Sequence, residues 1–115
     1  MKSDLPERTL KFAGRIVKLS RSLDEQGSTS RTLAKQLLRS GTSIGANVEE
    51  AVAAQSKPDF VSKQNIALKE AREILYWLRL LVATEIMTEP KFSELIQESN
   101  ELVAILTTPV RSARS

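Results

Sequence analysis

Residues 58–84 read PDFVSKQNIALKEAREILYWLRLLVAT and carry the most informative helical pattern in the chain. The segment opens with a proline, which suits the first turn of a helix, and contains no further proline or glycine. Its main apolar stripe recurs at the spacing of one helix face and comprises Phe60, Ala67, Ala71, Ile74, Leu75, Leu78 and Val82. We therefore predict a long amphipathic helix over 58–84.

The same helix has a second apolar stripe on a neighbouring face. Ile66, Trp77 and Leu81 lie on this face, together with Lys63 and Glu70. One stripe is enough for a bundle core, and tryptophan is favoured at the centres of protein interfaces. We predict an oligomer interface that contains Ile66, Glu70, Trp77 and Leu81. The alternative is that this stripe forms the edge of the core.

Toward the N-terminus, apolar periodicity predicts two more helices, over 5–26 and 30–55. Gly41 and Gly45 lie on the buried side of the second, where two glycines cost about 2 kcal/mol relative to alanine. A close approach to another helix would offset this cost, so we assign Gly41 and Gly45 to helix packing. The neighbouring helix could belong to the same chain or to another subunit.

Toward the C-terminus, the sequence predicts a fourth helix over 89–107, which ends before Pro109, and a basic tail over 108–115. Four helices joined by short turns fit an all-α, antiparallel up-and-down four-helix bundle. We expect residues 1–115 to form one such domain. No segment shows the alternation of a β-strand.

The composition narrows the class of protein. The 115 residues include no cysteine and no histidine. The absence of cysteine excludes a disulfide framework, and no stretch is apolar enough to span a membrane, so we expect a cytoplasmic protein. The absence of both residue types removes the usual general base and nucleophile pairs. We expect no catalytic site, no metal and no cofactor, although Glu49, Glu50 and Glu70 leave open a magnesium-dependent enzyme.

Charge is distributed unevenly along the chain. Residues 1–48 hold nine basic and four acidic side chains, whereas residues 49–101 hold six basic and ten acidic ones. The basic side chains of the first two helices line faces that point away from the predicted core. We predict that they contact nucleic-acid phosphates: Arg8, Lys11, Arg15, Lys18, Arg21, Arg31, Lys35 and Arg39. The alternative is an ordinary solvated surface.

Several segments of the two central helices resemble a known family. They are Leu37–Asn47 (LLRSGTSIGAN), Glu50-Ala51, Asp59-Phe60, Ile66–Glu73 (IALKEARE) and Tyr76-Trp77-Leu78. They resemble the four-helix-bundle proteins named for intervening sequences of bacterial large-subunit ribosomal RNA genes, and the related accessory variability determinant proteins of diversity-generating retroelements. The resemblance is most specific around Ser40–Asn47.

The resemblance implies a homo-oligomer, a pentamer above all, whose basic surface binds RNA or DNA. In the retroelement branch it also implies a reverse transcriptase as partner. We therefore expect a non-enzymatic, homo-oligomeric nucleic-acid-binding protein, accessory to a ribosomal RNA insertion or to a retroelement reverse transcriptase. The alternative is a protein-interaction scaffold that has no nucleic-acid partner.

Overall fold

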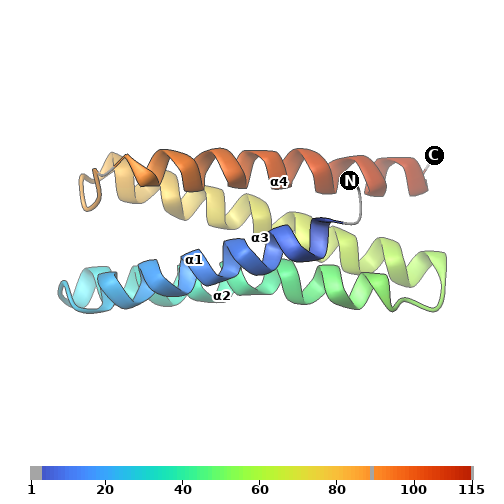
Figure 1. Cartoon of the computed structure of the whole chain (residues 1–115), viewed down its shortest axis with the longest axis horizontal. Helices are drawn as coiled ribbons and strands as arrows, with labels where there is room; N and C mark the ends of the chain where they lie inside the picture. The colour runs from blue at the N-terminus through green and yellow to red at the C-terminus, as the bar shows by residue number, and fades with distance from the viewer. Residues whose placement is uncertain (1–3, 89, 115) are drawn as a thin grey trace.

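Four helices make up the fold of the residues that the structure describes. A computed structural model describes residues 4–88 and 90–114, with the side chains of all of these except residues 91 and 109–114. The helices are α1 (Leu5–Asp24), α2 (Ser28–Val52), α3 (Lys57–Ala83) and α4 (Lys91–Arg114). They run side by side along the long axis of a particle of 45 × 21 × 20 Å (Figure 1). The predicted four-helix bundle is thus confirmed.

Each helix buries a seam of residues that alternates between three- and four-residue intervals. In α3 the seam comprises Gln64, Ala67, Ala71, Ile74, Leu78 and Leu81. In α4 it comprises Phe92, Leu95, Ser99, Leu102 and Leu106. The mean interval of about 3.5 residues keeps a seam facing its partners in a left-handed bundle. The core follows this seam through the whole length of the bundle.

The seam corrects the prediction for the end of the third helix. Leu81, which we assigned to the oligomer interface, is 0% exposed and belongs to the core. Val82, which we assigned to the main stripe, is 42% exposed. Both residues satisfy helical spacing from Leu78, but only the three-residue step to Leu81 continues the alternation that the seam requires.

The helix boundaries differ from the predicted ones by a few residues at most ends, as is usual for helix termini. The C-terminal end differs more, because α4 continues to Arg114, so residues 108–114, which we predict as a basic tail beyond the last helix, are helical. Pro109 lacks an N–H group and removes one hydrogen bond, but the helical backbone continues beyond it. Residues 1–3, Glu89 and Ser115, which the predicted domain and segments included, lie outside the described residues.

Gly41 and Gly45 face α1 of the same chain. A Cβ atom at Gly41 would lie 2.8 Å from Cγ2 of Ile16, and one at Gly45 would lie 3.2 Å from Oγ1 of Thr9. Ile16 and Thr9 are both fully buried. The two glycines therefore allow α1 and α2 to approach closely, which is the intramolecular explanation of their presence.

None of the helices in residues 4–88 and 90–114 combines the length and the apolar character needed to cross a membrane.

Candidate nucleic-acid interface

The eight basic residues predicted to contact phosphates lie on α1 and α2. Seven of them are exposed, and Arg8 is half-buried. They do not form one continuous free patch, because several point to acidic side chains on other helices.

Arg8 and Arg15 connect α1 to α4. The guanidinium group of Arg8 donates hydrogen bonds to both carboxylate oxygens of Glu98, at 3.0 and 2.6 Å, and to Glu101 at 2.8 Å. These hydrogen bonds, first that with Glu98 and then that with Glu101, raise the pKa of Arg8 above its ordinary value. Arg15 makes a longer ion pair with Glu94, at 3.4 Å. Arg8 is therefore a structural link between two helices more than a free cation.

Arg39 connects α2 to α3. It donates hydrogen bonds to both oxygens of Glu70 at 3.3 Å and another to Glu73. The indole N–H of Trp77 donates to Glu73 at 3.0 Å. The hydrogen bond from Trp77, and next that from Arg39, lowers the pKa of Glu73, so this carboxylate stays ionised. Glu70 and Trp77, two of the predicted interface residues, are thus held by contacts within the chain.

The remaining cations on α1 and α2 are less constrained. Arg31 lies 3.6 Å from Asp24, a distance that makes a weak exposed pair. The other four cations are exposed and make no ion pair in the part of the chain that the structure describes: Lys11, Lys18, Arg21 and Lys35. We call these the four free cations.

Two of the four free cations border a groove between α1 and α2. Arg21 comes from α1 and Lys35 from α2, and Val17, Ala34 and Leu38 provide the apolar part of its lining. The lining also includes Asp24, whose carboxylate lies 3.6 Å from Arg31. An anionic group placed over this groove would therefore meet cations from two helices and one carboxylate. Arg21 and Lys35 suit a phosphate contact, which Asp24 weakens.

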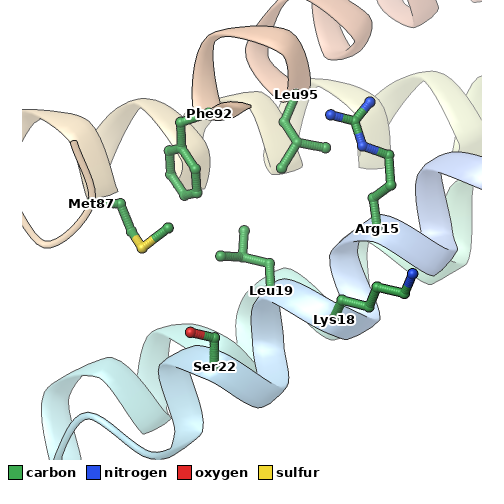
Figure 2. Close-up of a pocket in the computed structure, with 7 residues that line it drawn as sticks. All are labelled: Arg15, Lys18, Leu19, Ser22, Met87, Phe92 and Leu95. Carbon is green, nitrogen blue, oxygen red and sulfur yellow. The ribbon is translucent and has the colours of Figure 1, made fainter. Parts of the chain in front are cut away.

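Lys18 and Arg15 border a separate pocket of about 240 Å³. Leu19, Met87 and Phe92 extend into it from α1, the α3–α4 connection and α4, while Arg15 and Lys18 lie along one side (Figure 2). Ser22 provides the only uncharged polar side chain of the lining. The pocket lacks the set of hydrogen-bonding groups with which proteins distinguish nucleic-acid bases.

The predicted oligomer interface is only partly available on the surface. Ile66 is 37% exposed, Glu70 and Trp77 are half-buried, and Leu81 is entirely in the core. Two of the three acidic residues considered for magnesium are also engaged, since Glu50 pairs with Lys63 at 2.9 Å and Glu70 with Arg39 at 3.3 Å. Within residues 4–88 and 90–114, no three His, Cys, Asp or Glu side chains gather as a metal site would require.

Sequence reasoning missed a basic surface on α3. Lys69, Arg72 and Arg79 are exposed and make no ion pair among the described residues, and Tyr76 lies between them in the sequence. The signal was present, because these four positions are separated by three, four and three residues. The charge distribution along the chain does not reveal it, because residues 49–101 hold more acidic than basic side chains.

The four packed helices and the exposed cations on α1, α2 and α3 define a class of protein: an all-helical bundle with several basic surfaces. A model of the family described as 23S rRNA-intervening sequence protein matches residues 1–108, and the chain belongs to this family. The chain is also similar to a solved structure from Bacteroides thetaiotaomicron, described as a protein of unknown function from the S23 ribosomal protein family.

The two chains are 46% identical, with a TM-score of 0.85, and the similarity covers 91% of this chain and 96% of the other. None of the curated protein sequences compared with the chain is significantly similar to it. The resemblance inferred from the sequence is therefore confirmed at the level of the family. The family description names no catalytic activity.

Proposed function

We propose that this protein is a non-enzymatic, homo-oligomeric nucleic-acid-binding protein that contacts phosphates through α1 and α2. The observation that carries the proposal is the set of four free cations, which are exposed and have no acidic partner among the described residues. Each phosphate that such a cation neutralises releases counterions, which favours binding. A cation held by a carboxylate must first give up that contact, so Arg8 and Arg39 contribute less.

The family supports RNA as the nucleic acid. Its description refers to an intervening sequence of 23S ribosomal RNA, and that of the Bacteroides relative refers to a ribosomal protein family. We propose that the chain acts as an accessory protein to such an RNA insertion. A retroelement reverse transcriptase is a weaker proposal, since neither description mentions one. The absence of histidine and cysteine from the whole sequence supports a role without catalysis.

Self-association is the second part of the proposal. It is supported by large apolar side chains that are exposed on three helices, including Leu10 at 66% on α1 and Ile66 at 37% on α3. Two single variants, Leu10→Glu and Ile66→Glu, distinguish these faces. We expect Ile66→Glu to reduce the particle mass measured by light scattering. If Leu10→Glu does so instead, the interface lies on α1.

Binding is tested by titrating a labelled, structured RNA with the protein across a salt series. The variant Lys18→Gln/Lys35→Gln removes two free cations. We expect the slope of log affinity against log salt to become shallower by about 2, because each lost phosphate contact removes about one released counterion.

The matched control is Arg8→Gln/Arg15→Gln, which changes the net charge equally but removes cations paired with Glu98 and Glu94. We expect its slope to change by less than about 1. An equal effect of the two variants would contradict the assignment of the free cations. Binding of RNA no stronger than that of another polyanion of equal charge would favour the protein-interaction scaffold.

A further inference from the structure

The outermost face of α3 carries a basic stripe with one aromatic residue inside it. The stripe consists of Lys69, Arg72, Tyr76 and Arg79, and we call it the α3 stripe. The spacing of three, four and three residues places the four side chains on one face, opposite the buried seam through Ala71, Ile74 and Leu78. From Lys69 to Arg79 the helix rises about 15 Å, which is enough for a few nucleotides of a single strand.

The cations of the α3 stripe are available. Lys69, Arg72 and Arg79 are exposed and make no ion pair among the described residues. The adjacent acids do not neutralise them, because Glu70 and Glu73 are turned toward α2 and held by Arg39. An anionic ligand therefore meets three uncompensated positive charges on this face.

Tyr76 gives the stripe a second kind of contact. Its side chain is 59% exposed, and it is the only aromatic residue of the described chain that is exposed to this extent. The ring packs edge-to-face against Trp77, with centroids 5.1 Å apart and an interplanar angle of 72°. Trp77 is itself held by Glu73, which is held by Arg39. This series of contacts supports the tyrosine ring in its exposed position.

We propose that the α3 stripe binds an unpaired segment of single-stranded nucleic acid, with a base stacked on Tyr76 and the flanking phosphates on Lys69, Arg72 and Arg79. Exposed aromatic rings among cations are the usual means of holding single strands, because every base has a face that can stack. A paired duplex does not offer this contact, since its bases stack on one another. The inference rests on the proposed nucleic-acid function and adds the state of the strand that this face recognises.

The test compares one labelled RNA oligonucleotide as a single strand and as a duplex with its complement. For Tyr76→Ala, we expect the affinity for the single strand to fall about tenfold, whereas the affinity for the duplex changes less than about twofold. Tyr76→Phe retains the ring and should bind like the wild type. Val82→Ala is the matched control, because Val82 is exposed on the same helix but lies outside the stripe. Thermal unfolding of each variant checks that it is folded.

A second readout uses Trp77, the only tryptophan in the sequence. Because its ring lies beside Tyr76, a base stacked on Tyr76 should quench its fluorescence, and Tyr76→Ala should reduce this quenching. Single-stranded DNA of the same sequence forms a further arm. A parallel loss with DNA assigns the stripe to any unpaired strand, and a loss with RNA alone assigns it to RNA.

Three results would overturn the inference while leaving the proposed function intact: unchanged single-strand affinity of Tyr76→Ala, an equal loss for single strand and duplex, or a change of particle mass in light scattering, which would identify the stripe as a subunit contact. If the wild-type protein binds neither form of the RNA, the proposed function itself fails.

Discussion

Glu73 receives hydrogen bonds from two different helices and thereby links the aromatic pair on α3 to α2. The indole of Trp77 and the guanidinium group of Arg39 both donate to it. Because both contacts favour the ionised carboxylate, the pKa of Glu73 is lowered from its ordinary value. The ionised Glu73 carboxylate therefore contributes its full stabilisation at a pH above the pKa that Glu73 has in the unfolded chain. This stabilisation is lost as the pH falls through the lower pKa that Glu73 has in the folded protein.

We expect Glu73→Gln to destabilise the protein at pH 7, and we expect the difference from the wild type to shrink as the pH falls below about 4. About a third of the Glu73 side chain is exposed, so solvent screening limits the effect to about 1 kcal/mol or less. Urea unfolding of both proteins at pH 7 and in acid measures it. Glu49→Gln is the control, because Glu49 is an exposed carboxylate without an ion pair in the described chain. A difference in unfolding free energy between Glu73→Gln and the wild type that does not change with pH would contradict the role given to Glu73.

Gly41 is a second residue whose role can be tested alone. Its hydrogen faces Ile16, and a methyl group there would lie within 3 Å of two Ile16 side-chain carbons. The Ile16 side chain is fully buried and has little room to move. We expect Gly41→Ala to lower the free energy of unfolding by about 1–2 kcal/mol, because overpacking outweighs the higher helix propensity of alanine.

Gly14 provides the matched comparison. It lies within α1, is exposed, and has nothing within 4 Å of the position that a Cβ atom would take. Gly14→Ala should therefore raise the free energy of unfolding by about 0.5–1 kcal/mol. Chemical denaturation of the two variants tests the assignment of Gly41 to helix packing. Equal effects of the two substitutions would show that α1 does not approach α2 closely at Gly41.

At the scale of the helices, the sequence predicts the number and type of elements well and their ends less well. The apolar period identifies all four helices, but it does not distinguish Leu81 from Val82, because both fit a straight helix from Leu78. Packing in the bundle buries Leu81 and leaves Val82 exposed, because only Leu81 continues the alternating seam. This seam is a property of the packed helices. Pro109 is a misleading stop signal for a different reason, because one missing hydrogen bond does not end α4.

The position of Leu81 in the core leads to a prediction. Leu81→Ala should lower the free energy of unfolding by about 2–5 kcal/mol, whereas Val82→Ala should change it by less than about 1 kcal/mol. Urea unfolding at several protein concentrations measures both. A Leu81→Ala effect that varies with protein concentration would instead assign Leu81 to a subunit interface, which is what the sequence alone predicts.

In the folded molecule, packing of the helices pairs charges that lie far apart in the sequence. The sequence has a basic N-terminal half and an acidic remainder, but the acids of α3 and α4 bind several of the N-terminal arginines. The partner of Arg8 lies 90 residues away in the sequence, so no local pattern could have predicted the pair. What periodicity does predict is the face on which each cation lies. Which of these cations remain free depends on the packing of the helices.

We propose that an assembly of this chain binds RNA through cations that the fold leaves free. Light scattering of the purified protein, alone and with a structured RNA across a salt series, tests both the assembly and the binding of RNA. We predict a particle several times the 12.8 kDa of one chain that takes up RNA at low salt and releases it steeply as salt increases. A particle of 12.8 kDa that binds no RNA at any salt concentration would rule out both the self-association and the RNA binding proposed for this protein.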